Sequence, residues 1–205
     1  METVTYRRQR VFDPLLRLLH WFNALAIVLL FATELGAEAL EKGPAREAVW
    51  HGHVLLGYGL IAGLGLRLLW GLVGPQRARW SDFFHVSVWL RRQKADAGAF
   101  GHDAWASLAY LGLYAVLIGM GATGLVAAAG YFQLGPLADG GITRELAHSF
   151  KEVHELGANL VWAFIAVHIG ALIWHERRGA PMAQSMVSGY QYRVADESQQ
   201  AQSAA

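Results

Sequence analysis

Four histidines are spaced so that they could bind metal in two pairs. His154 and His168 lie 14 residues apart in the last long apolar stretch. On a helix this spacing falls only roughly 40° short of four full turns, so both rings share one face and lie about 21 Å apart along the axis. Metal-ligating side chains inside a membrane are costly unless they have partners or a function. Each of the two is therefore a candidate functional residue.

Each of these histidines would need a partner at its own depth on another helix. His20 lies near the start of the first apolar stretch, at the level expected for His168. His53 lies near the start of the second, at the level expected for His154. Imidazoles that face each other can hold a low-spin iron above and below a flat macrocycle. The spacing therefore predicts two b-type haems stacked across the bilayer, ligated by the pairs His20/His168 and His53/His154.

His51 is a rival for the outer pair. His51 and His53 point to nearly opposite faces of a helix because they are two residues apart. We favour His53, which shares its face with Gly57 and Arg67, but the sequence leaves the choice open.

Small residues lie one turn from all four candidate ligands, where a flat macrocycle needs room. Gly57 follows His53 by four residues, and the others are Ala24, Gly157, Ala158 and Ala171. Small residues also allow helices to approach closely, which is the alternative explanation for any one of them.

Three cations lie near the candidate ligands. Arg67 falls at the depth of the inner haem, where a haem propionate or a quinone oxygen would supply an anionic or polar acceptor; snorkelling to the surface is the alternative. Arg17, three residues before His20, could meet a propionate, and interfacial anchoring is its alternative. For Lys151, three residues before His154, we favour anchoring.

The elements that would position these residues are four membrane-spanning helices. Of the 205 residues, 54% are hydrophobic and only 16% are charged. Four apolar stretches are long enough to cross a hydrocarbon core of roughly 30 Å. We expect an all-α, antiparallel four-helix bundle embedded in the membrane, forming one domain over residues 1–193, followed by a disordered polar tail over 194–205. The expected helices are about 15–35, 49–73, 104–129 and 153–174.

Charge and cysteine content exclude other classes of function. A net charge of +1 gives no field that would gather phosphates, which argues against nucleic acid as a partner. The absence of cysteine excludes disulfides, iron–sulfur clusters, c-type haem attachment and thiolate zinc sites.

The distribution of Lys and Arg predicts the orientation. Twelve lie near the N-terminus, the second loop and the C-terminal end, whereas four lie in the first and third loops. Because these residues resist translocation, both termini should be cytoplasmic, and we expect a multi-pass protein of the bacterial inner membrane. A cleaved signal peptide ending near Ala37–Ala39 is a competing interpretation that would remove His20.

Several motifs resemble those of the prokaryotic cytochrome b561 family, which is similar to the b-type cytochrome subunits of membrane-bound nickel–iron hydrogenases. The resemblance covers about residues 10–193. The motifs are DPLLRLLHWFN (13–23), His53-x-x-x-Gly57-Tyr58, RLLWGLVGP (67–75), Gly101-His102-Asp103 and His154-Glu155, followed by Asn159 and His168. The resemblance implies that His20 and His168 hold one haem b, that His53 and His154 hold the other, and that the bundle exchanges electrons with a membrane quinone.

The sequence thus predicts a di-haem cytochrome that transfers electrons between membrane quinone and a periplasmic-side redox protein. An alternative is a superoxide:quinone oxidoreductase that acts without a partner subunit. Two further alternatives come from other classes: a histidine-based carrier of metal ions and a haem-free membrane anchor. The carrier would need carboxylates or methionines among the intramembrane histidines, and the apolar stretches offer almost none. The oligomeric state, the quinone site and the direction of electron flow are left open by the sequence.

Overall fold

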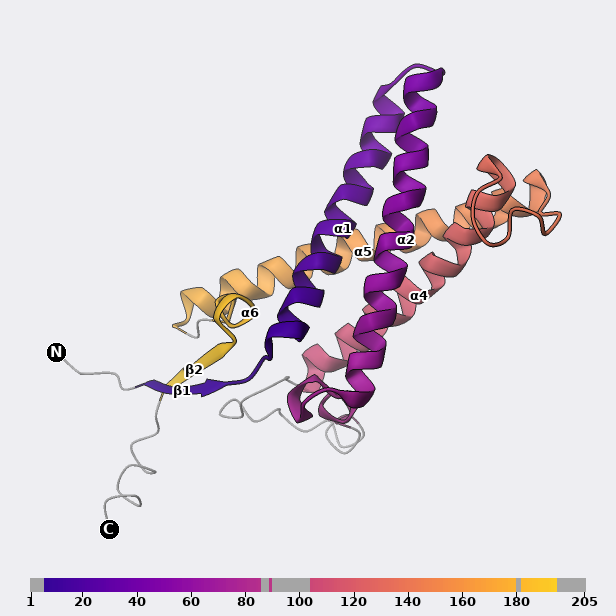
Figure 1. The fold of residues 1–205 in the computed structure, drawn as a ribbon. Coiled ribbons are helices and arrows are strands. Elements are labelled where there is room, and N and C mark those ends of the chain that lie inside the picture. Colours follow the sequence, from indigo (N-terminus) through magenta and orange to yellow (C-terminus); the bar gives the residue numbers. More distant parts are fainter. Residues whose placement is uncertain (1–5, 86–88, 90–103, 180–181, 195–205) are drawn as a thin grey trace, which may run out of the picture. The chain divides into compact units, whose positions relative to one another are not determined.

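The computed structural model describes residues 6–85, 89, 104–179 and 182–194 (Figure 1). Four long helices dominate, joined by short helical turns and one pair of strands. In chain order the elements are β1 (Tyr6–Arg10), α1 (Pro14–Ala39), α2 (Pro44–Val73), η1 (Gln76–Ala78), η2 (Trp80–Asp82), α4 (Ala104–Phe132), α5 (Arg144–Arg177), α6 (Ser185–Ser188) and β2 (Tyr190–Val194).

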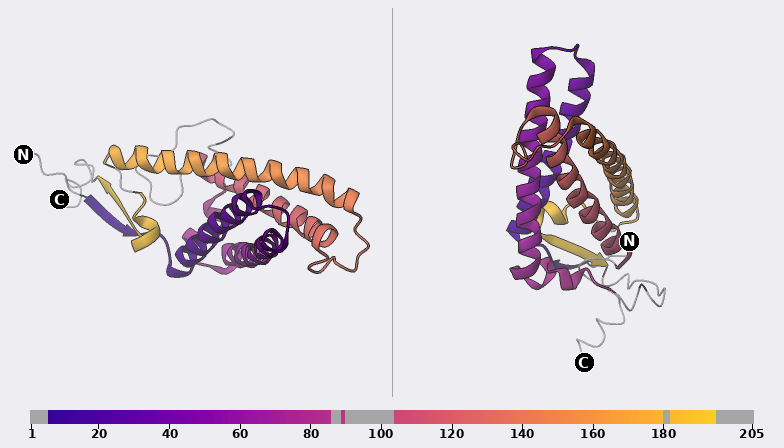
Figure 2. Two further views of the ribbon diagram at one scale, coloured as in Figure 1. Left: turned by 90° about the horizontal axis from the view of Figure 1, so that it is seen from above. Right: turned by 90° about the vertical axis from the view of Figure 1, so that its right-hand side faces the viewer.

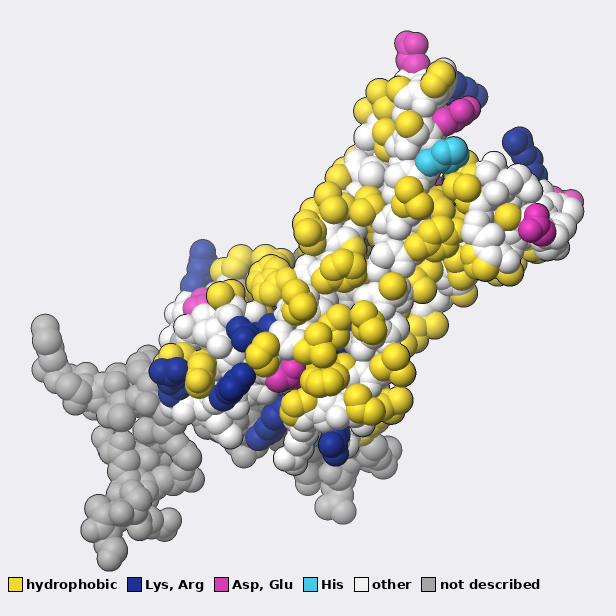
Figure 3. All heavy atoms as spheres, in the orientation of Figure 1, with side chains coloured by type: hydrophobic (Ala, Val, Ile, Leu, Met, Phe, Trp, Pro, Cys, Tyr) yellow, Lys and Arg dark blue, Asp and Glu magenta, His cyan; other side chains and the backbone are white. Residues whose placement is uncertain are grey.

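The four long helices confirm the predicted all-α membrane fold. Each is long and apolar enough to cross a bilayer. Large hydrophobic side chains remain exposed along them, including Leu25, Leu55 and Val167, and hydrophobic side chains are spread along the face shown in Figure 3. Because a water-soluble protein of this size would bury such a surface, these side chains are suited to lipid.

The helix α5 is longer than predicted. It begins at Arg144, about nine residues before the expected start. The added turns carry Glu145, His148 and Glu152, which are exposed. An apolar stretch marks only the part of a helix that lies in hydrocarbon, so hydropathy does not detect a polar extension at the end of the span. Thr143 caps this extension, accepting a hydrogen bond at Oγ1 from the amide of Leu146 at 3.2 Å.

Contacts between Cα atoms divide the chain into two compact units, and each long helix contributes to both. The first unit comprises residues 1–18, 70–109 and 166–205, and the second comprises 19–69 and 110–165. The prediction of a single domain over 1–193 stays a prediction.

The second unit is a four-helix core. Phe31, Leu64, Leu117 and Val161 come from α1, α2, α4 and α5 in turn and form its buried centre. The segments of α1 and α2 in this unit lie side by side, joined by the turn at 40–43 (Figure 2).

Contacts within the second unit show that neighbouring helices run antiparallel. Between α1 and α2, Asn23 packs against Gly63 and Thr33 lies against His53. Residue numbers therefore rise along α1 in the direction in which they fall along α2. The pairs Thr123/His154 and Gly130/Ala147 show the same relation between α4 and α5.

The first unit contains a small antiparallel sheet that was not predicted. β1 pairs with β2 in a register that runs from Tyr6 opposite Val194 to Arg10 opposite Tyr190. The two strands are only five residues long, and the first, YRRQR, lacks the apolar alternation that would indicate a strand. Val194, expected in the polar tail, is therefore the last residue of β2, and residues 195–205 of that tail lie outside the described residues.

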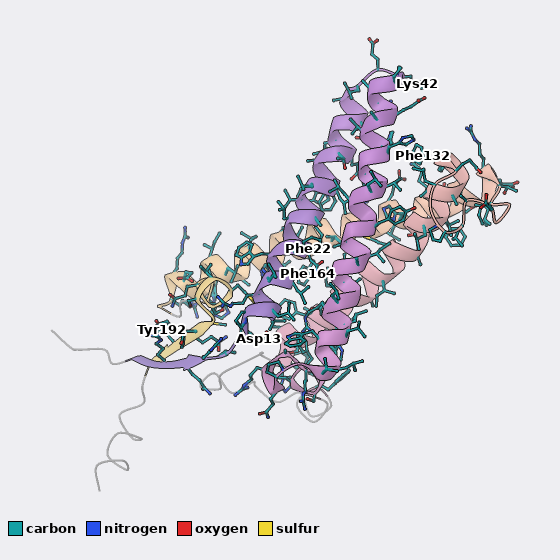
Figure 4. All side chains as sticks on the ribbon, viewed as in Figure 1. Asp13, Phe22, Lys42, Phe132, Phe164 and Tyr192 are labelled. Atoms are coloured by element: carbon teal, nitrogen blue, oxygen red, sulfur yellow. The ribbon has the colours of Figure 1, made fainter. Side chains whose placement is uncertain are left out.

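The start of α1 is fixed within the first unit. Asp13 Oδ1 accepts a hydrogen bond from the amide of Leu16 at 3.0 Å, and Pro14 occupies the first helical position. The indole of Trp70 also donates to Asp13, at 3.2 Å to Oδ1. Figure 4 labels Asp13 at this end of α1. A small core of Val11, Phe12, Leu16 and Ala78 packs around this start.

Candidate functional site

His53 of α2 and His154 of α5 face each other in the second unit. Their ring centroids are 6.4 Å apart, and the ring planes are inclined by 72°. A bond from an imidazole nitrogen to a metal ion is about 2.0–2.1 Å long, so two such bonds with their rings span roughly 6 Å between centroids. The separation therefore suits one metal atom held between the two rings.

The hydrogen bonds of His53 leave its Nε2 available to a metal. Its Nδ1 lies 3.0 Å from the hydroxyl oxygen of Thr33 on α1. That hydroxyl is 2.8 Å from the carbonyl of Leu30, to which it donates. The hydroxyl oxygen can then accept from the N–H of His53, which places the ring proton on Nδ1.

His154 is held in the same way from α4. Its Nδ1 lies 3.0 Å from the carbonyl oxygen of Met120 and 3.2 Å from the hydroxyl of Thr123. A carbonyl only accepts, so Nδ1 carries the proton and Nε2 keeps its lone pair. A side chain at Gly124 would meet the Cε1 atom of this ring at 3.2 Å, so the glycine lets the ring lie against α4.

A largely apolar cavity of about 340 Å³ surrounds the two rings. Its volume is in the range of small-molecule and cofactor sites. Gly57 lines it, and a Cβ atom at this position would meet nothing within 4 Å. Ala158 also lines it, but Gly157 instead admits the side chain of Met120, which a Cβ would approach to 2.6 Å. Gly57 and Ala158 therefore fit the need for room around a macrocycle, and Gly157 serves helix packing.

Charged side chains also line this cavity. They are Arg46, Lys151, Glu34 and Glu155. Lys151 is already paired with Glu155 one turn along α5. Arg46 forms no ion pair with the residues that the structure describes. Arg46 is thus a candidate partner for an anionic group of a cofactor.

Tyr58 is a second lining residue to which sequence reasoning gave no role. Its hydroxyl is buried and has no hydrogen-bond partner within the described residues. It lies against Gly135, where a Cβ atom would approach it to 2.0 Å. Gly135 also has a φ of +90°. The loop after α4 therefore needs glycine there, both for this backbone conformation and for the close approach of Tyr58. The motif His53-x-x-x-Gly57-Tyr58 contained this residue, but a single tyrosine beside a ligand carries no signal of its own.

His51 lies outside the cavity. Its ring is exposed and packs edge-on against Phe132, with centroids 5.7 Å apart; Figure 4 labels Phe132 at the end of α4. The geometry thus favours His53 over His51 as the partner of His154.

The other predicted pair is divided between the two units. His20 of α1 belongs to the second unit, and His168 of α5 belongs to the first. His20 packs edge-on against Trp21 at 5.2 Å between centroids. The pairing of His20 with His168 stays a prediction.

Arg67 is in the same unit as His20. The antiparallel register that sets Asn23 beside Gly63 brings His20, one turn before Asn23, to the level of Arg67, one turn after Gly63. Arg67 is only 4% exposed, and its guanidinium carbon lies 5.7 Å from the ring centroid of Tyr114. Such burial favours an internal partner for this charge over snorkelling.

Two other residues of interest are placed differently. Arg17 belongs to the first unit, where its Nη1 donates to the carbonyl of Val187 just before β2. This bond connects the start of α1 to α6. The binding of a propionate by Arg17 stays a prediction. His102, part of one of the motifs, lies outside the described residues.

Four apolar helices whose core holds two facing imidazoles are features of a membrane protein that can hold a metal atom between its helices. The chain belongs to the prokaryotic cytochrome b561 family, whose model matches residues 11–189. It is accordingly a transmembrane b-type cytochrome of electron transfer that binds haem b. A search of curated proteins found no match to the chain.

Proposed function

We propose that this cytochrome holds two haems b and carries electrons between a membrane quinone and a reactant on the outer side of the membrane. The observation that carries the proposal is the facing pair of His53 and His154, in which each Nδ1 lies within hydrogen-bond distance of a group on a neighbouring helix. These hydrogen bonds leave Nε2 of each ring for a metal. Haem iron held by two imidazoles cycles between ferric and ferrous states and so supplies one-electron transfer.

The chain's residues would hold the outer haem as follows. His53 and His154 would bind the haem iron, and Gly57 would leave space beside His53. Arg46 at the cavity wall pairs with a carboxylate of the cofactor. The surrounding apolar side chains exclude water, which keeps the site at low dielectric.

The inner haem would be held by His20 and His168. Arg67, buried at the level of His20 beside Tyr114, supports this assignment because its positive charge can also pair with a propionate or a quinone oxygen. The quinone would react beside this haem. On the outer side the reactant is a periplasmic redox protein or a small oxidisable species such as superoxide.

The number of haems in purified wild type and two histidine variants tests the proposal. We expect about two haems per chain by pyridine haemochrome in the wild type and in His51→Ala, and about one in His53→Ala, because only His53 faces His154. Both substitutions remove a histidine from the same stretch of α2, so His51→Ala controls for general damage. A colourless wild type from haem-sufficient cells, or loss of a haem from His51→Ala alone, would contradict the proposal.

A quinone-linked assay tests the electron path. Reduced haem in membranes should be reoxidised by added quinone, and Arg67→Met should slow this step while keeping both haems if Arg67 binds the quinone. Candidate outer donors, including a superoxide source, can be compared in the same assay. Failure of every quinone to oxidise the haem would remove the quinone from the proposal.

A further inference from the structure

Two threonines stand behind the facing histidines in the same arrangement. Thr33 of α1 contacts His53 of α2, and Thr123 of α4 contacts His154 of α5. Neither threonine lines the cavity itself. Each therefore touches the site only through the histidine on the next helix.

The hydroxyl hydrogens of both threonines are directed to their own helices. Thr33 donates to Leu30, three residues earlier, at 2.8 Å. Thr123 is 2.9 Å from the carbonyl of Gly119 and 3.1 Å from that of Met120. With its hydrogen used in this way, each hydroxyl offers an oxygen lone pair to the ring N–H at Nδ1.

We propose that Thr33 and Thr123 are positioning residues that fix the tautomer and ring plane of the two outer ligands and lower the reduction potential of the haem between them. The inference rests on the proposed ligand pair His53/His154. An acceptor at Nδ1–H raises the basicity of the imidazole, and a more basic axial ligand stabilises ferric over ferrous iron.

Each histidine also has a backbone partner on the helix of its threonine. The Nδ1 atom of His154 lies 3.0 Å from the carbonyl oxygen of Met120. His53 is hydrogen-bonded to the backbone of Leu30 as well as lying 3.0 Å from Thr33 Oγ1. Loss of either threonine should therefore weaken the support of its ring without removing every acceptor.

The inclination of the rings offers a spectroscopic measure of their positions. The planes of His53 and His154 are inclined by 72°. The electron paramagnetic resonance spectrum of a low-spin ferric haem depends on the angle between its two imidazole planes, and near-perpendicular rings give the more anisotropic signal. A ring released from its threonine would change that signal.

The test compares Thr33→Val, Thr33→Ser and Thr123→Val in the full chain with its haems bound. Valine keeps the shape of threonine and removes the hydroxyl, whereas serine keeps the hydroxyl. We expect Thr33→Val to shift the ferric/ferrous equilibrium of one haem about tenfold toward ferrous, which is an upward shift of about 59 mV for a one-electron couple. Thr123→Val should shift the same haem in the same direction, and Thr33→Ser should match the wild type.

The readouts are redox titration, the resonance spectrum and the haem content of each variant. Loss of one haem from Thr33→Val with full retention in Thr33→Ser also supports the inference, because the hydroxyl then decides ligation. Unchanged potentials and spectrum in Thr33→Val, or equal damage in Thr33→Val and Thr33→Ser, overturn it while the wild type still contains two haems. A wild type without haem overturns the proposed function and the inference together.

Discussion

At the scale of single residues, the candidate site depends on which atom of each histidine is left for the metal. In both His53 and His154 the Nδ1 atom is bonded to a neighbouring helix, and this holds Nε2 toward the cavity. Intramembrane histidine pairs without such support would lose ring order as well as affinity, since the partners of metal ligands set tautomer and orientation.

The space above Gly57 is a testable part of this site. Gly57→Leu should lose the outer haem, because a Cβ there points into the cavity space with nothing within 4 Å and a longer side chain would occupy it. Gly59→Leu on the same helix also meets nothing within 4 Å but does not line the cavity, so it should keep both haems. Haem content by pyridine haemochrome measures both variants, and equal retention would show that Gly57 lies away from the macrocycle.

The sequence predicted the facing histidines but missed their supports. Spacing within one helix and depth in the membrane are local properties, and they sufficed to favour His53. Thr33 and Arg46 lie on parts of the chain whose closeness to the site depends on the rotation of α1 and α2 about their own axes. The periodicity of the sequence does not show which neighbouring helix a single polar side chain faces.

At the scale of elements, the apolar spans were predictable and their polar surroundings were not. The order, number and approximate positions of the four long helices follow from hydrophobic length alone. The extension of α5 and the β1–β2 pairing depend on hydrogen bonds outside the apolar stretches, which hydropathy does not detect.

The connection between α6 and β2 requires glycine. Gly189 has a φ of +85°, and its carbonyl accepts hydrogen bonds from the amides of Val11 at 2.9 Å and Phe12 at 3.2 Å. A Cβ atom at this position would lie 2.7 Å from the carbonyl oxygen of Phe12. Both backbone conformation and contact therefore exclude a side chain.

Alanine substitution should separate these two effects. Gly179 also has positive φ, at +74°, but a Cβ there meets nothing within 4 Å. We expect Gly179→Ala to lower the free energy of unfolding by about 1 kcal/mol from backbone strain alone, and Gly189→Ala to lower it by roughly 1 kcal/mol more. Unfolding in detergent measures both, and equal losses would show that the contact with Phe12 relaxes without cost.

At the scale of the whole molecule, the exposed hydrophobic side chains of the four helices set the protein in a membrane, and the Lys/Arg distribution predicts its direction. Twelve basic residues lie in the segments expected to be cytoplasmic and four in those expected outside. This bias resists translocation of the N- and C-terminal segments.

Reporter fusions test that orientation. A fluorescent protein that matures only in the cytoplasm, joined after residue 205, should fluoresce, and alkaline phosphatase inserted into the turn at 41–43 should be active outside. The opposite pattern would contradict the predicted orientation and would place His53 and His154 on the cytoplasmic side. Fusions in the turn and at the end serve as controls for each other because they report opposite compartments.

The pairing of β1 with β2 has a consequence for biosynthesis. The two strands are separated by about 180 residues, so a ribosome working at 5–20 residues per second needs roughly 10–40 s to pass from one to the other. During that interval β1 has no strand to pair with, although the helices between are already being inserted. The sheet can therefore close only after β2 has been made, and its formation marks a polypeptide whose four spans have all been synthesised.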